Sequence, residues 1–200
     1  VANRTALFDE NGEKSADFDA VLTVDGAYKA ADFINFCDAY DIPVLSLTNV
    51  KGYAADVRSE KSIAKAVAKL TYAFANANVP KVNVITGEAY GSAYVTMNSK
   101  ALGADVTYAW PDASIGMMDA NEAAKIMYAD DIAKSADVQS VISEKAAEYA
   151  ALQSGVESAA ARGYVDTIIN PEDTRKYVAA AFEMLYTKRE DRPDKKHGTV

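Results

Sequence analysis

Apolar residues return at three- and four-residue intervals from Ala27 to Tyr40, which is the period of an amphipathic helix. Pro43 follows and cannot continue that helix. The next run, Val44–Val50, is short, apolar and β-branched, and such runs are typical of buried strands. The pattern therefore predicts a helix followed at once by a strand inside the protein.

The same helix–strand unit follows twice more. A helix is predicted over Ser62–Ala77, with Pro80 after its end, and a strand over Val82–Thr86. A third helix is predicted over Tyr94–Leu102 and a third strand over Val106–Trp110. Helices that alternate with short apolar strands favour an α/β fold around a parallel sheet.

The start of the chain carries a different pattern. Residues 1–19 are mostly polar and contain Asn11-Gly12, so we expect a loop there, before a short apolar segment at Ala20–Val24. Because the first residue is Val1 rather than Met, this loop is expected to be the beginning of a truncated piece of a longer chain.

Past Ser114 the pattern is mainly helical. Helices are predicted over Ala120–Tyr128, Asp137–Leu152 and Thr174–Lys188. Residues 188–200 are charged and irregular, and we expect them to form a C-terminal tail. Residues 20–187 are thus expected to form one domain, an α/β core followed by a helical C-terminal region.

Composition limits the function classes that remain. The chain has 200 residues, of which 50% are hydrophobic and 25% charged. This length and composition are typical of one globular domain that is stable without disulfide bonds. A net charge of -8 argues against nucleic acid as a partner, and no apolar run reaches the roughly 20 residues of a membrane span. We therefore expect no nucleic-acid partner, no direct membrane insertion and a cytoplasmic location. Cys37 and His197 are alone of their kinds, so neither a disulfide framework nor a metal site is expected.

The segment with the clearest chemical meaning is Gly87–Tyr94, which joins a predicted strand to a predicted helix. Small residues let a ligand approach the backbone, and unpaired N–H groups at a helix start can stabilise an oxyanion. A second small-residue turn, Asn49–Tyr53, follows the preceding strand, and parallel strands bring such turns to one edge. The pattern indicates an anion-stabilising pocket of backbone groups; the alternative is a turn whose small residues serve packing alone.

Other candidate side chains give weaker evidence of a chemical role. Ser92 lacks the G-x-S-x-G surroundings of a hydrolase nucleophile, and His197 lies in the predicted tail, which leaves only a Ser–Lys dyad. Cys37 and Trp110 are expected in the core. Lysines at four-residue spacing on one helix face could meet an anion but favour a solvated surface: Lys61, Lys65 and Lys69.

Runs of residues along nearly the whole chain from about Asp25 carry a family resemblance. They are Lys29–Pro43, Val79–Val82, Ala89–Tyr94, Met97–Lys100, Leu102–Asp105, Tyr108–Pro111, Ala160–Asp166, Pro171–Arg175 and Lys195–Gly198. In order and spacing they resemble the carboxyltransferase components of biotin-dependent acyl-CoA carboxylases and decarboxylases. That family includes propionyl-CoA carboxylase β subunits and methylmalonyl-CoA decarboxylase α subunits, and belongs to the crotonase superfamily.

The resemblance implies a ClpP/crotonase-like α/β fold, with a ββα superhelix as its core. The chain is similar to the C-terminal one of the family's two crotonase-like domains. The resemblance also implies acyl-CoA as substrate and biotin, on a carrier protein, as cofactor. Three partners are implied: the N-terminal carboxyltransferase domain, the biotin carboxyl carrier protein, and further copies of the chain in a trimer or hexamer.

A set of site residues is implied in the same way. In the family, backbone amides of the motif that matches Gly91-Ser92-Ala93 form an oxyanion hole for the ureido oxygen of biotin. The amides of Ser92 and Ala93 would be the donors, and Gly91 would allow the turn. The residues implied to contact biotin or to shape the acyl pocket are Gly52, Tyr53, Tyr90, Tyr94 and Val95.

The implied activity is the transfer of CO2 between carboxybiotin and an acyl-CoA, either propionyl/methylmalonyl- or acetyl/malonyl-CoA, with the fragment inactive alone. The chain departs from the family pattern at four positions near the implied site: Lys51, Lys65, Ser92 and Asp119. These departures favour one alternative, a non-catalytic oligomerisation or assembly domain of a carboxylase complex. Another alternative is a crotonase-like acyl-CoA hydratase or isomerase, with Glu88 or Asp119 as its carboxylate.

Overall fold

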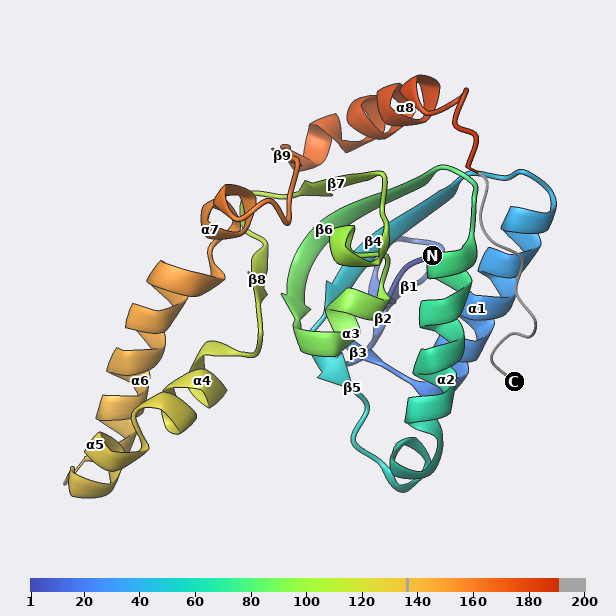
Figure 1. Ribbon diagram of the computed structural model, residues 1–200. Helices are drawn as coiled ribbons and strands as arrows, with labels where there is room; N and C mark the ends of the chain where they lie inside the picture. Colours follow the sequence, from blue (N-terminus) through green and yellow to red (C-terminus); the bar gives the residue numbers. More distant parts are fainter. Residues whose placement is uncertain (136, 191–200) are drawn as a thin grey trace.

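A parallel sheet forms the centre of the computed structural model, which describes residues 1–135 and 137–190. Its strands lie in the order β4, β6, β7 and β9, and β8 pairs with the far end of β6 (Figure 1). Every pairing in this sheet is parallel. The bounds are β4 Val44–Val50, β6 Lys81–Tyr90, β7 Val106–Ala109, β8 Ser114–Gly116 and β9 Thr167–Ile168. The parallel α/β core predicted from the sequence is confirmed.

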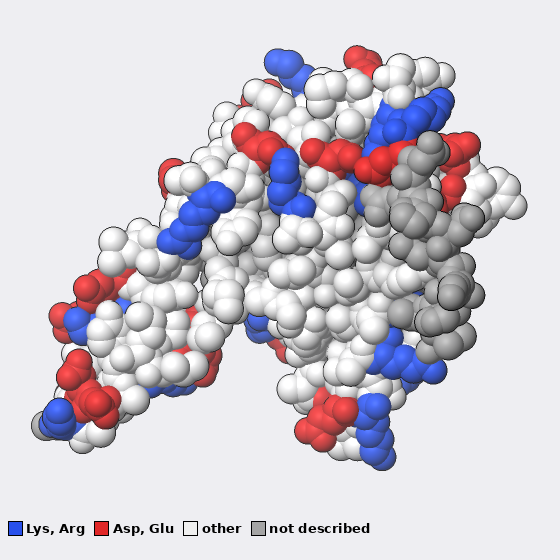
Figure 2. Space-filling model, in the orientation of Figure 1, with Lys and Arg blue, Asp and Glu red and all other residues white. Residues whose placement is uncertain are grey.

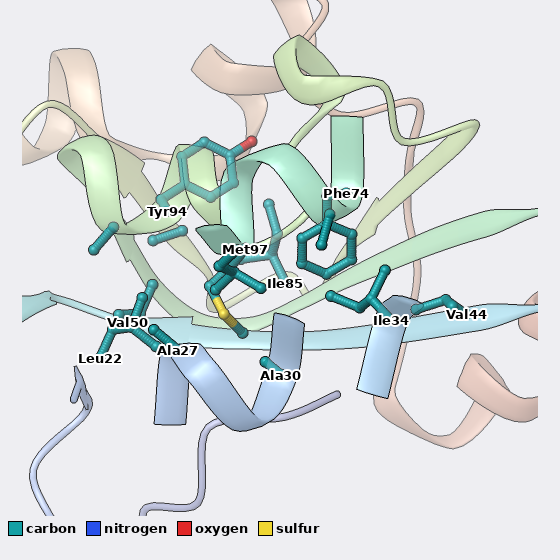
Figure 3. Close-up of a cluster of buried hydrophobic side chains, with 14 of the residues drawn as sticks. Leu22, Ala27, Ala30, Ile34, Val44, Val50, Phe74, Ile85, Tyr94 and Met97 are labelled. Carbon is teal, nitrogen blue, oxygen red and sulfur yellow. The ribbon is translucent and has the colours of Figure 1, made fainter. Parts of the chain in front are cut away.

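Helices α1, Val24–Ala39, and α2, Val57–Asn76, pack side by side over one face of this sheet. The apolar face predicted for α1 is buried: Ala27, Ala30, Ala31, Ile34 and Cys37. The same face of α2 contributes Ala66, Leu70 and Phe74. Figure 3 shows Phe74, Ile34 and Met97 together between these helices and the strands.

Helix α8, Thr174–Met184, covers the opposite face of the sheet. Val178 and Ala181 of this helix pack with residues of β6 and β7 in a second, smaller cluster. Trp110 lies partly buried against that cluster, where its indole N–H donates to Thr174 Oγ1 over 2.9 Å. The expected core positions of Cys37 and Trp110 are thus found, with Trp110 at the margin.

Between β8 and β9 the chain forms a helical arm that projects from the sheet (Figure 1). The arm consists of α4 Ala120–Met127, α5 Ala129–Lys134, α6 Val138–Tyr149, a π-helical turn Ala150–Ser154 and α7 Val156–Ala161. Among the described residues of these helices, only those of α7 reach the main core, through Val156 and Ala159. The helical region predicted past Ser114 is therefore present, with two short strands, β8 and β9, that the sequence pattern missed.

Residues 1–19 differ from the predicted loop, because they contain a hairpin of β1, Ala6–Phe8, and β2, Lys14–Asp17. Gly12, at a φ of +81°, turns the chain, and Asp9 Oδ1 accepts from the Glu13 amide over 2.8 Å. The hairpin strands are largely exposed, so they carry no alternation of apolar and polar residues that would identify them.

The predicted helix and strand ends shift for identifiable reasons. Thr23 and Asp56 accept hydrogen bonds from amides of the first turns of α1 and α2, so both helices start before their apolar periodicity does. The helix predicted over Tyr94–Leu102 is instead a six-residue helix, α3, Gly91–Thr96, and a separate 3₁₀ turn, Lys100–Leu102. Asn98, at a φ of +59°, separates them.

The C-terminal tail predicted at residues 188–200 begins inside the folded structure. Lys188 forms an ion pair of 2.9 Å with Asp105, and its side chain is only 10% exposed. His197 and the rest of the predicted tail lie outside the described residues. In residues 1–135 and 137–190, no helix has the length and apolarity that crossing a membrane requires.

Candidate functional site

The two small-residue turns predicted at the ends of neighbouring strands meet in the structure. After β4 the chain enters β5, Gly52–Tyr53, which pairs in parallel with β3, Val21–Leu22. After β6 it enters α3 directly, and α3 contacts β5. Gly52 and Tyr53 therefore lie against the helix that starts at Gly91 (Figure 1).

The segment Gly87–Tyr90 is strand rather than the predicted turn. It continues β6 and pairs with β8, so the turn is compressed into the single step from Tyr90 to Gly91. A register shift in the β4–β6 ladder sits between Thr48 and Val50. There, Asn49 Oδ1 accepts from the Glu88 amide over 3.1 Å. A Cβ on Gly87 would lie 2.8 Å from that Asn49 oxygen, so a larger residue there would displace the Asn49 side chain.

Gly91 sets the direction in which α3 leaves the sheet. Its φ is +58°, which L-residues other than glycine rarely adopt, and a Cβ there would lie 3.0 Å from the Met117 carbonyl oxygen. No side chain caps α3, so the amides of Ser92 and Ala93 have no acceptor within the helix. Ser92 is exposed, whereas Ala93 is 1% exposed. The start of α3 thus offers two backbone donors without a helix acceptor, one on an exposed residue and one on a buried residue, as an anion site requires.

Tyr90 and Tyr94 flank this turn and differ in their partners. The Tyr90 hydroxyl donates to Ser114 Oγ on β8 over 2.8 Å. The Tyr94 hydroxyl is buried and has no hydrogen-bond partner among the described residues. Burial raises the pKa of Tyr94 to about 12, and the neighbouring Tyr164 adds to the shift. Of the two, only Tyr94 keeps a free polar atom next to α3.

Replacing Tyr94 with phenylalanine is expected to leave the free energy of unfolding equal or higher at pH 7, since it removes an unpaired buried hydroxyl. The folded tyrosine holds its proton to about pH 12, whereas the unfolded one loses it near pH 10. As pH rises from about 10 to about 12, deprotonation favours the unfolded state. Tyr94 therefore lowers the free energy of unfolding over this range, by up to about 3 kcal/mol. Urea unfolding of both proteins at pH 8 and pH 11 measures this. An equal loss of stability in both proteins would contradict it.

Apolar surface surrounds the start of α3 on its open side. Val95 is 41% exposed and Met117, which follows β8, is 76% exposed. The start of α3 lies on the side of the core that faces the helical arm (Figure 1), and Figure 2 shows the surface hollowed between arm and core. No sequence pattern indicated Met117, because β8 reaches the turn only through sheet pairing.

Two of the four departures from the family pattern, Lys51 and Asp119, have local structural roles, and Ser92 keeps its backbone amide. Lys51 lies 3.5 Å from Asp19 in an exposed ion pair. Lys65 is exposed on α2, as is Lys61, whereas Lys69 pairs with Asp32 over 2.9 Å. Asp119 is the N-cap of α4, where its Oδ1 accepts from the Asn121 amide over 2.9 Å. Asp119 therefore serves the arm, which weakens its case as an acid–base group.

Two hollows in the described structure lie away from α3. One, of about 570 Å³, is bordered by Pro43, Pro80, Phe182, Tyr186 and other residues near the end of α8. The other lies between β4 and α8, against Leu45, Leu47 and Val178. Neither hollow borders α3, so the candidate site at α3 is an open surface rather than an enclosed pocket. Among residues 1–135 and 137–190, no three His, Cys, Asp or Glu side chains come together as a metal site would need.

Comparisons with known proteins identify the family of this chain. The family model described as carboxyl transferase domain matches residues 1–200. The propionyl-CoA carboxylase beta chain of Saccharopolyspora erythraea is 46% identical over 184 residues, which cover 90% of this chain and 34% of that protein. The methylmalonyl-CoA carboxyltransferase 12S subunit of Propionibacterium freudenreichii subsp. shermanii is 43% identical over 178 residues, covering 88% and 34%.

A solved structure supports the same relationship. The transcarboxylase 12S crystal structure, described as a hexamer assembly with methylmalonyl-coenzyme A and methylmalonic acid bound, has a TM-score of 0.85 at 42% identity. The match covers 89% of this chain and 34% of that one. The chain thus spans about a third of the length of the curated relatives it matches.

Proposed function

The chain belongs to the carboxyl transferase domain family, and from this premise we propose that it is the biotin-binding half of a carboxyltransferase site. In this proposal residues 20–187 are the C-terminal one of two crotonase-like domains, and the complete site moves CO2 between carboxybiotin and an acyl-CoA. The observation that carries the proposal is the uncapped start of α3, where two adjacent amides have no acceptor within the helix. The acyl-CoA is of the propionyl/methylmalonyl type, as in the names of the relatives, or of the acetyl/malonyl type.

The residues around α3 fit a bound biotin. Gly91 leaves the approach to the amides free of a side chain, and Gly52 has no neighbour within 4 Å of its Cβ position. The Tyr94 hydroxyl is buried in the core and has no hydrogen-bond partner among the described residues. Tyr53 and Tyr90 would complete the walls. Val95 is apolar and exposed, which suits contact with an acyl group.

The chemical role of the chain is electrostatic. Biotin supplies the ureido nitrogen that carries the transferred carboxyl group. The amides of Ser92 and Ala93 donate hydrogen bonds to the ureido oxygen and stabilise the negative charge that it gains during transfer. Each such fixed donor contributes about 2.7–4 kcal/mol to transition-state stabilisation. No acid–base side chain of this domain is needed for that task.

The partners follow from the open side of the site. We propose that the N-terminal carboxyltransferase domain of a partner subunit faces α3 and holds the acyl-CoA, and that biotin arrives on its carboxyl carrier protein in the cytoplasm. Exposed apolar side chains on the arm favour association into a trimer or hexamer: Ile126, Met127 and Leu152. The same side chains favour the second candidate, a non-catalytic assembly domain.

Carboxyl transfer from methylmalonyl-CoA or malonyl-CoA to free biotin tests the proposal. A carboxyltransferase that carries this domain together with its N-terminal partner domain is expected to be active, and the 200-residue chain alone is expected to be inactive. If the two-domain protein is folded and oligomeric but transfers no carboxyl group, the assembly candidate replaces the proposal. Hydration of crotonyl-CoA that is lost in Glu88→Gln or Asp119→Asn would instead identify a hydratase.

A further inference from the structure

Helix α3 cannot hold its own orientation. It has six residues, which is well below the about 12–15 residues at which isolated helices become stable in water. Its first turn carries the two proposed donors, so the direction of those N–H bonds depends on what anchors the helix elsewhere. Gly91 fixes one end through its backbone conformation. The other end, at Met97, needs a tertiary contact.

Thr48 on β4 provides that contact. Its side chain is 0% exposed, and its hydroxyl lies 3.3 Å from the carbonyl oxygen of Met97 and 2.8 Å from Asn83 Oδ1 on β6. Met97 is the C-cap of α3, and the carbonyl groups at the end of a helix have no N–H donor within the helix. A buried carbonyl without a donor is costly. The Thr48 hydroxyl has one proton, and it reaches the Met97 carbonyl when the Asn83 amide turns its otherwise unpartnered Nδ2 toward Thr48 Oγ1. In that arrangement the hydroxyl of Thr48 fixes the position of the end of α3 relative to the sheet.

The backbone after Met97 strengthens this anchor. Asn98 has a φ of +59°, a conformation that costs free energy for a residue other than glycine and persists only when the surroundings enforce it. Its Nδ2 lies 3.5 Å from the carbonyl of Val82, on the same strand as Asn83. The chain thus turns back sharply onto the sheet directly after the carbonyl that Thr48 holds.

We propose that Thr48 is a positioning residue for the oxyanion hole, acting through the Met97 carbonyl and the length of α3. The inference rests on the proposed function, because it assigns a role to the amides of Ser92 and Ala93. Thr48 touches neither biotin nor acyl-CoA in this assignment. A misplacement of about 1 Å at a reacting centre can cost about 10²-fold in rate, so a loosened α3 would lower kcat.

The matched control is Thr107 on β7. Thr107 pairs with Asn83 in the sheet, is 0% exposed as Thr48 is, and has a hydroxyl with no hydrogen-bond partner among the described residues. Thr→Val at both positions makes the same chemical change in the same layer of the core. Only Thr48→Val removes a contact with α3. Thr48→Ser keeps the hydroxyl and serves as the rescue variant.

The variants are compared in the assembled two-domain carboxyltransferase. Thr48→Val is expected to lower kcat about tenfold with little change in the KM for acyl-CoA, whereas Thr48→Ser and Thr107→Val retain it. In parallel, hydrogen exchange at the amides of Met97 and Ser99 is expected to be roughly fivefold faster in Thr48→Val alone.

The outcomes separate this inference from the proposed function. Unchanged kcat in Thr48→Val, or equal losses in Thr48→Val and Thr107→Val, would overturn the positioning role while transfer by the unmodified protein still supports the function. If the unmodified protein transfers no carboxyl group, the positioning role falls with the proposed function, and the exchange rates report only whether Thr48 anchors α3. Faster exchange in Thr48→Val alone supports the anchor, and equal exchange overturns it.

Discussion

Ser92→Pro is expected to lower kcat for carboxyl transfer by about 10²–10³-fold, because it deletes one of the two backbone donors proposed to stabilise the ureido oxygen. Proline is tolerated in the first turn of a helix, where the missing N–H has no partner within the helix. Ser92 occupies that turn of α3, and its side chain is exposed, so the fold should accept the change. Steady-state transfer from methylmalonyl-CoA to biotin, in the two-domain protein, measures the loss.

Ser92→Ala provides the comparison, since it keeps the amide and removes only the hydroxyl. Its kcat is expected to exceed that of Ser92→Pro by at least about tenfold. Thermal melts of both variants show whether proline has disturbed the fold. Full transferase activity in a folded Ser92→Pro protein would remove Ser92 from the oxyanion hole.

Phe74→Ala is expected to lower the free energy of unfolding by about 3–5 kcal/mol, the usual result of emptying a buried aromatic site. Phe74 is 0% exposed and packs between α2 and the sheet, close to Ile34 and Met97 (Figure 3). A domain of ordinary stability has about 5–15 kcal/mol in total, so this single change removes a large part of it. Urea unfolding midpoints measure the difference.

Phe33→Ala makes the same truncation on the outer side of α1, where the ring is 52% exposed. Its effect is expected to stay within about 0.5 kcal/mol, as at most surface positions. Similar losses in the two variants would contradict the assignment of the core to the inner faces of α1 and α2. A small loss in Phe74→Ala would mean that neighbouring side chains refill the space.

Local patterns identified the elements that bury one clear face. The strand predicted over Val44–Val50 has those bounds in the structure, and the apolar positions predicted for α1 are buried. The crotonase-like α/β fold inferred from the resemblance agrees with the likeness to transcarboxylase 12S. The helix and strand predictions are correct because periodicity and burial are both properties of a short stretch of chain.

Elements that are exposed, or that form only by pairing with a distant segment, were not predicted. The hairpin of β1 and β2 has no buried face, and β8 is three residues long, so neither leaves a periodic signal. The strand β6 was predicted to end at Thr86, yet it continues to Tyr90 because β8 pairs with its last residues. Such pairing joins segments more than 20 residues apart and is invisible to a local pattern.

The sequence alone determined the alternation of helices and strands from α1 to β7, the buried faces of α1 and α2, and a small-residue segment between β6 and α3, because each depends on neighbouring residues. Only the tertiary structure decided how that segment is held. The Met117 carbonyl that makes glycine necessary at Gly91 and the Thr48 hydroxyl at the end of α3 both come from distant strands or turns. Their free-energy contributions arise from contacts across the sheet, which exist only once the chain has folded.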